Sequence, residues 1–183
     1  IFGITAIYIA VSHDYPASAW AIVGQQIAWI TLGVVISFVV MFFNTKFLWQ
    51  MTPLLYIFGL GLMVLPLVFY SPTLVASTGA KNWVTIGGTT LFQPSEFMKI
   101  SYILMLSRSV VQFSKRHKEE VRTLGMDWLL ILELFLYTIP VLLLLTLQSD
   151  LGTALVFLAI FSGIVLLSGV SWKIILPIFL TGV

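Results

Sequence analysis

The polar residues best suited to chemistry lie in two short stretches of an otherwise apolar chain. In the first, Glu96 and Lys99 are three residues apart, so on a helix they lie on one face and can form an ion pair. Pro94 fits the first helical position, which places Glu96 in the first turn, where the helix dipole favours a carboxylate. Ionisable side chains within membrane spans are functional by default. We therefore interpret the pair as part of a polar site; the alternative is an ion pair that only ties helices together.

The second stretch, residues 148–153, reads Gln-Ser-Asp-Leu-Gly-Thr. Ser149 or Asp150 can cap the helix that follows, and capping alone would be a sufficient role for Asp150. However, Glu96, Lys99 and Asp150 are all expected at helix starts on the same membrane face. Helix N-termini attract anions, so this face suits a phosphorylated polar headgroup. The sequence does not establish that the two helices touch.

The sequence predicts a small β-hairpin just before the first stretch, in the loop that follows the expected span 47–70. Residues 83–86 and 89–92 are rich in β-branched and aromatic side chains and flank Gly87-Gly88, a pair that favours a tight turn.

The composition excludes several classes of protein. The chain has 183 residues, of which 60% are hydrophobic and 9% charged, with a net charge of +2. An ordinary soluble domain has about 45–50% apolar and about 25% charged residues. A soluble enzyme and a nucleic-acid-binding protein are therefore both excluded. There is no cysteine, and the two histidines, His13 and His117, are far apart, which argues against a thiolate or histidine metal site.

Charge-poor windows predict an all-α fold, a polytopic transmembrane helical bundle. A span needs about 20 apolar residues. The expected spans are residues 1–12, 17–43, 47–70, 94–113, 128–147, 151–170 and 174–183, with a loop at 71–92 and another at 114–127. The chain starts without Met and begins and ends inside apolar runs, so we expect a fragment of a longer membrane protein.

The distribution of Lys and Arg predicts the orientation in the membrane. One set of alternate loops holds only Lys81, whereas the other holds six cations, namely Lys46, Lys115, Arg116, Lys118, Arg122 and Lys173. The positive-inside rule makes loop 114–127 cytoplasmic and loop 71–92 outward-facing. We interpret the basic stretch 115–122 as a solvated loop that sets topology, in preference to a site for a partner or a lipid headgroup. Arg108 and Glu133 are interpreted as structural, with Glu133 as the expected partner of Arg108.

Three stretches resemble a known family: Lys-Asn-Trp at 81–83, Phe-Gln-Pro-Ser-Glu-Phe-Met-Lys at 92–99, and Gln-Ser-Asp-Leu-Gly-Thr at 148–153. They are similar to motifs of the shape, elongation, division and sporulation (SEDS) family, which contains RodA, FtsW and SpoVE. Ser149 stands where the family usually has Pro, and Asp-Leu is more similar to RodA than to FtsW. The resemblance covers the whole chain. It implies a ten-helix protein, of which six to seven spans are present here.

The resemblance also implies a function. It implies a multi-pass protein of the bacterial cytoplasmic membrane, surrounded by membrane lipid, that polymerises lipid II at the outer face as a peptidoglycan glycosyltransferase for cell elongation, shape and division. The implied partner is a class B penicillin-binding protein acting as transpeptidase. No nucleic acid is involved. The main catalytic Asp of the family is expected beyond residue 183, so the chain alone is expected to be inactive.

The resemblance carries over Glu96, Lys99 and Asp150 as site-forming residues, with Trp83 and Gln93 as further candidates. Glycosyl transfer needs a carboxylate that takes the proton of the attacking hydroxyl and positive charge near the departing pyrophosphate. Lys99 or Lys81 would supply that charge, with Asp150 or Glu96 orienting the cation. No cofactor is evident, and the question of a divalent cation is left open.

Two other functions remain open at this stage. A lipid II flippase or transporter also places charged residues at interrupted helices, although such proteins bind substrate near the bilayer midplane rather than at one face. A non-catalytic scaffold of the cell-wall synthesis complex would use the paired charges only to hold helices together. That scaffold predicts that Glu96→Gln combined with Lys99→Met is nearly harmless.

Overall fold

The computed structural model describes residues 3, 5, 6, 8, 9, 19–87, 89–117, 123–171 and 174, which are mostly helical. In chain order the elements are α2 (Ala19–Met41), α3 (Thr45–Val68), α4 (Pro72–Thr78), β1 (Val84–Ile86), β2 (Thr89–Phe92), α5 (Pro94–Arg116), α6 (Leu124–Leu147) and α7 (Leu151–Leu167). Of the spans expected at 1–12 and 174–183, only residues 3, 5, 6, 8, 9 and 174 are described, and residues 118–122 of the expected loop 114–127 lie outside the described residues.

Three of the described helices are long and apolar enough to cross a membrane: Ile22–Met41 within α2, then α3 and α6. The apolar helix α7 is shorter, with 17 residues. Large apolar side chains on α2 are exposed, including Trp20, Phe38 and Met41. A helix that is apolar all round and exposed in this way suits a lipid environment.

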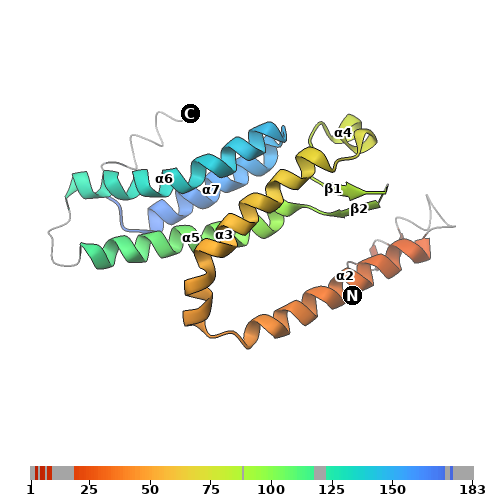
Figure 1. The fold of residues 1–183 in the computed structure, drawn as a ribbon, viewed down its shortest axis with the longest axis horizontal. Coiled ribbons are helices and arrows are strands. Elements are labelled where there is room, and N and C mark those ends of the chain that lie inside the picture. Colours follow the sequence, from red (N-terminus) through yellow and green to blue (C-terminus); the bar gives the residue numbers. More distant parts are fainter. Residues whose placement is uncertain are drawn as a thin grey trace. The chain divides into compact units, whose positions relative to one another are not determined.

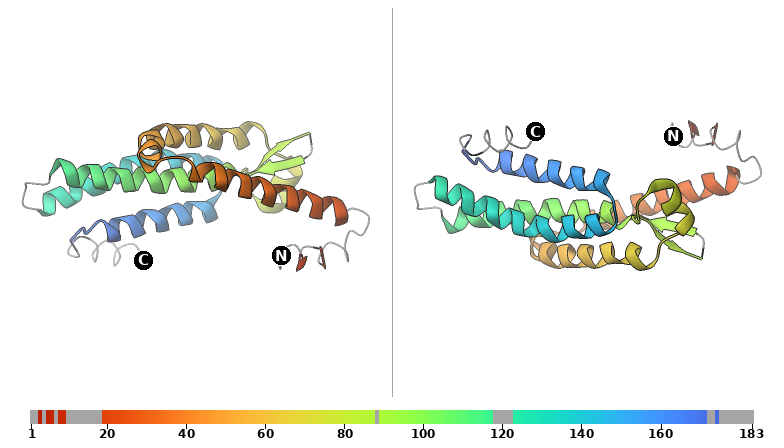
Figure 2. Two further views of the ribbon diagram at one scale, coloured as in Figure 1. Left: turned by 90° about the horizontal axis from the view of Figure 1, so that it is seen from below. Right: turned by 90° about the horizontal axis from the view of Figure 1, so that it is seen from above.

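The chain divides into two compact units, residues 1–48 and 49–183. In the second unit, α5, α6 and α7 run side by side (Figures 1 and 2). Their core is fully buried and contains Tyr102 and Leu106 of α5, Leu134 of α6 and Phe157 of α7. The rings of Tyr102 and Phe157 lie 5.2 Å apart, so the helices that carry the two polar stretches do touch.

Helix α3 joins this core through a close approach to α5. A Cβ atom added at Gly59 would lie 2.7 Å from Sδ of Met98, so a larger residue there would require the buried Met98 side chain to shift. Small residues allow membrane helices to approach closely and gain van der Waals contact. On α6, the backbone carbonyl of Tyr137 accepts a hydrogen bond from the hydroxyl of Tyr56. Helix α3 is therefore held to both α5 and α6.

The short helix α4, the β-hairpin and the α6–α7 turn lie at one end of the second unit (Figure 1). Figure 1 shows α4, the hairpin, the start of α5 and the turn between α6 and α7 at this end, which we call the hairpin end. Strands β1 and β2 pair antiparallel, with Ile86 opposite Thr89, and Gly87 adopts a positive φ of 59° in the turn. The predicted hairpin is thus confirmed, as is the start of α5 at Pro94 in the first helical turn.

Candidate functional site

Asp150 is the N-cap of α7 and connects that helix to a distant loop. Its Oδ1 accepts a hydrogen bond of 3.0 Å from the backbone N–H of Thr153. Its Oδ2 accepts from the Thr153 hydroxyl at 2.8 Å and from the side-chain amide of Asn82 at 2.7 Å. The residue is buried, with 8% of its surface exposed. The predicted cap is confirmed, and the same carboxylate also binds the Lys-Asn-Trp stretch.

A backbone contact reinforces this junction. The N–H of Lys81 donates a 2.8 Å hydrogen bond to the carbonyl of Gln148. The side chain of Gln148 is buried, and its amide donates to the carbonyl of Met63 on α3 at 2.6 Å. Gln148 thereby ties the α6–α7 turn to α3 and to the loop at residue 81.

The two candidate lysines at the hairpin end have different surroundings. The Lys99 ammonium group lies 2.8 Å from a carboxylate oxygen of Glu96, as the spacing predicted. The Glu96 side chain is 63% exposed and that of Lys99 is 26% exposed. The ammonium group of Lys81 instead lies over the ring of Tyr70, 4.7 Å from its centroid, in a cation–π contact. Glu96 therefore orients Lys99, whereas Asp150 orients the loop next to Lys81 through Asn82.

Three buried side-chain oxygens between residues 82 and 95 have no hydrogen-bond partner among the described residues: Oδ1 of Asn82, Oγ1 of Thr85 and Oγ of Ser95. Buried polar groups are normally hydrogen-bonded, and exceptions in a native structure call for an explanation. Here they cluster in the sequence beside the residues that carry the candidate chemistry. The segment can accept further hydrogen bonds from water or a polar ligand.

The remaining predicted site residues lie nearby in sequence but take no part in these contacts. Trp83 is exposed at 37% of its surface and directly precedes β1. Gln93 is the N-cap of α5, with no side-chain capping bond. Within the described chain, no group of three or more His, Asp or Glu side chains is arranged to hold a metal ion.

The expected pairing of Arg108 with Glu133 is wrong. Arg108 donates to the backbone carbonyl of Trp49 and lies 5.8 Å from the centroid of its ring. Glu133 pairs with Arg116, whose Nη2 lies 2.9 and 3.0 Å from the two carboxylate oxygens. Sequence position alone could not decide between two arginines near one end of the same helix.

The sequence reasoning missed three residues that organise the structure. Asn82 and Gln148 were part of the motifs at 81–83 and 148–153, so their amides could have been considered as partners for a buried carboxylate or carbonyl. Asp127 is buried, and its Oδ2 accepts a 2.9 Å hydrogen bond from the N–H of Ser171, beyond α7. A carboxylate in the first turn of an apolar helix was the available signal for Asp127.

Comparison with known proteins identifies the class to which this fold and these motifs belong. Residues 1–183 match the FtsW/RodA/SpoVE family, described as cell cycle proteins, and the chain belongs to this family. The family is embedded in membranes, in agreement with the apolar helices α2, α3 and α6.

Two curated relatives are peptidoglycan glycosyltransferases by name. The chain is 36% identical over 104 residues to peptidoglycan glycosyltransferase MrdB of Helicobacter pylori. The aligned residues make up 56% of this chain and 26% of that protein. It is 29% identical over 168 residues to the probable peptidoglycan glycosyltransferase FtsW of Nitrosomonas europaea, covering 92% of this chain and 41% of the relative. The chain thus matches less than half of the length of either protein.

Solved structures show the same fold. The crystal structure of the rod shape determining protein RodA from Thermus thermophilus aligns with a TM-score of 0.68 and 27% identity, over 96% of this chain and 53% of RodA. A chain from a structure described as the structural coordination of polymerization and crosslinking by a peptidoglycan synthase complex aligns with a TM-score of 0.65 and 26% identity. That alignment covers 100% of this chain and 51% of the other.

Proposed function

We propose that the intact protein to which this chain belongs is a peptidoglycan glycosyltransferase that polymerises lipid II at the outer face of the bacterial cytoplasmic membrane. The observation that carries the proposal is the junction at the hairpin end, where Asp150 binds Asn82 and Gln148 binds Lys81. It joins two of the three stretches whose motifs resemble the SEDS family, 81–83 and 148–153, and the third, 92–99, runs into the start of α5 at the same end (Figure 1). The names of the relatives MrdB and FtsW support the same activity.

In this proposal the polar residues have separate roles. Glu96 and Lys99 form an exposed pair at the start of α5, and the Lys99 ammonium group binds the pyrophosphate of the substrate. Positive charge placed where a leaving group gains negative charge lowers the barrier to its departure. Asp150 is a positioning residue, because its two oxygens already accept three hydrogen bonds. The proton of the attacking hydroxyl is then taken by the carboxylate expected beyond residue 183.

The hairpin end faces outward in this proposal, because the cations Lys115 and Arg116 lie at the opposite end of α5. A class B penicillin-binding protein crosslinks the glycan product as the partner enzyme. The alignment with a chain of a peptidoglycan synthase complex supports this partnership.

The proposal is tested with the purified intact protein, with and without its transpeptidase partner, given labelled lipid II in detergent. Detergent leaves no membrane to cross, so transport alone yields no product. Glycan products are separated on a gel for the wild type, Lys99→Ala and Asp150→Asn. We expect a ladder of polymers from the wild type that is lost in both variants. If the wild type gives no ladder even with the partner present, the proposed glycosyltransferase activity is contradicted and a flippase is favoured. If the ladder survives both substitutions, Lys99 and Asp150 have structural roles only.

A further inference from the structure

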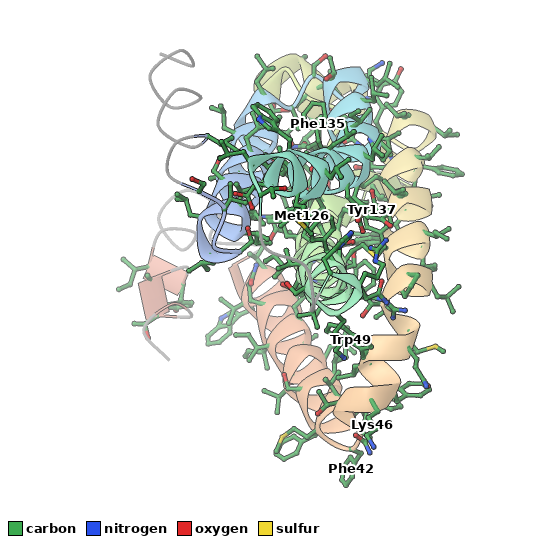
Figure 3. All side chains as sticks on the ribbon, turned by 90° about the vertical axis from the view of Figure 1, so that its left-hand side faces the viewer. Phe42, Lys46, Trp49, Met126, Phe135 and Tyr137 are labelled. Carbon is green, nitrogen blue, oxygen red and sulfur yellow. The ribbon has the colours of Figure 1, made fainter. Side chains whose placement is uncertain are left out.

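A second polar region lies at the other end of α5 and α6, away from the hairpin end. A cavity of about 570 Å³ opens there and is lined by Gln112, Lys115, Arg116, Glu133 and Tyr137. The first three residues come from the last two turns of α5 and the other two from the middle of α6. Figure 3 views the structure toward this end, with Tyr137 labelled.

The cavity lining offers more hydrogen-bond donors than the described residues use. Arg116 binds both carboxylate oxygens of Glu133 through Nη2, and among the described residues the N–H groups on Nη1 and Nε have no acceptor. Within the described part of the chain, Lys115 and Gln112 make no side-chain hydrogen bond or ion pair. The two cations and one carboxylate leave a net charge of +1. An ammonium group, a free guanidinium edge and an amide together suit a phosphate group.

The surface next to the cavity is apolar, which favours a phosphate group carried by a lipid over free phosphate. Leu129 and Leu136 are four residues before and three residues after Glu133, so all three lie on one side of α6. Their side chains are exposed, at 57% and 60% of their surfaces. A ligand with its headgroup in the cavity can therefore lay acyl chains along these leucines. Free phosphate would use only the polar part of this surface.

We propose that the cavity between α5 and α6 binds the phosphate of an anionic phospholipid headgroup. The sequence alone favoured a purely topological role for Lys115 and Arg116, because it showed a run of charges and no cavity. The folded arrangement adds the cavity, the donors from two helices and the adjoining apolar strip. The site is separate from the hairpin end and does not depend on the function proposed for it.

The test counts bound lipids by native mass spectrometry of the intact protein in detergent. The probes are phosphatidylglycerol, phosphatidylcholine of the same acyl chains and inorganic phosphate. We expect phosphatidylglycerol to bind more tightly than phosphatidylcholine. Lys115→Gln should weaken phosphatidylglycerol binding about fivefold, the change expected for one cation near an anionic lipid. Glu133→Gln should strengthen it, because the substitution removes a negative charge and releases Arg116.

Lys46→Gln is the matched control, since it removes the same charge from an exposed lysine that does not line the cavity. It should leave binding unchanged. Changes of opposite sign in Lys115→Gln and Glu133→Gln could not both come from misfolding. Equal binding of the two lipids, or equal effects of Lys115→Gln and Lys46→Gln, would overturn the proposal. Displacement of the lipid by an excess of inorganic phosphate would make free phosphate the ligand and overturn the lipid as its source.

Discussion

Asn82 donates a 2.7 Å hydrogen bond to Asp150 across 68 positions of sequence. The bond joins the loop before β1 to the cap of α7, and the parallel contact from Lys81 to Gln148 lies directly beside it in sequence. Motifs that look independent in the sequence therefore form one hydrogen-bonded region. Asp150, which caps α7, therefore influences the position of Lys81 through Asn82, although it does not contact Lys81 itself.

Asn82→Ala should loosen the hairpin end. The substitution removes a buried donor to a carboxylate, an interaction that contributes about 1.5–3 kcal/mol. We expect faster proteolysis of residues 70–93 in the detergent-purified protein and slower glycan synthesis, with the helices retained. Asn82→Asp should be more severe, because it places a second carboxylate against Asp150. The exposed residue Gln50 provides the control, as Gln50→Ala should change neither rate. If Asn82→Ala is cleaved at the wild-type rate, the Asn82–Asp150 bond does not hold the hairpin end in place.

Gln148→Leu should lower the melting temperature measured in detergent. The leucine keeps most of the buried volume but leaves the Met63 carbonyl without its donor, which costs about 1–3 kcal/mol. Gln148→Glu should be at least as damaging, because a carboxylate cannot donate to a carbonyl. If both variants have the melting temperature of the wild type, the bond from Gln148 to Met63 does not hold the α6–α7 turn against α3.

Ser149 has a positive φ of 58°, so its substitutions should have opposite outcomes. Glycine adopts this conformation freely, whereas other residues pay about 1–2 kcal/mol. Ser149→Gly should therefore fold as well as the wild type or slightly better. Ser149→Pro should be strongly destabilised, because proline fixes φ near −65° and removes the N–H that donates to the Thr146 carbonyl. Thermal melts of both variants decide the point. A stable Ser149→Pro protein would show that the turn has the negative φ compatible with the proline usual in the family.

Tyr102 and Thr138 form a buried hydrogen bond between α5 and α6 at 2.7 Å. The Thr138 hydroxyl gives its proton to the Leu134 carbonyl, so the Tyr102 hydroxyl is the donor in this pair. Tyr102→Phe removes that donor cleanly and should cost about 1 kcal/mol. Thr138→Val leaves the tyrosine hydroxyl buried without an acceptor and should cost about 1–3 kcal/mol. The free energies of unfolding of the two variants test this order, and the reverse order would contradict the assigned donor.

The sequence predicted those features that depend on local chemistry. The hairpin followed from Gly87-Gly88, the start of α5 from Pro94, and the Glu96–Lys99 pair from helical spacing. The cap at Asp150 was also a local prediction.

Contacts between distant segments could not be predicted in this way. Asn82 finds Asp150 only after the loop, α5, α6 and α7 have packed. Glu133 pairs with Arg116 rather than Arg108 because Arg108 instead binds the carbonyl and ring of Trp49. Partner choice among several charges depends on side-chain direction and helix rotation, which a single apolar sequence does not reveal.

The most direct test of the proposed site is the initial rate of glycan synthesis by Lys99→Gln against that by Lys46→Gln. Both substitutions remove one lysine charge, but only Lys99 lies beside Glu96 at the start of α5. Rates are measured over a range of lipid II concentrations with the partner transpeptidase present. The account predicts that Lys99→Gln loses at least about tenfold in kcat/KM, the effect of about 1.4 kcal/mol in the transition state, while Lys46→Gln keeps the wild-type value. Equal rates in the two variants would contradict a site at the hairpin end that uses Lys99.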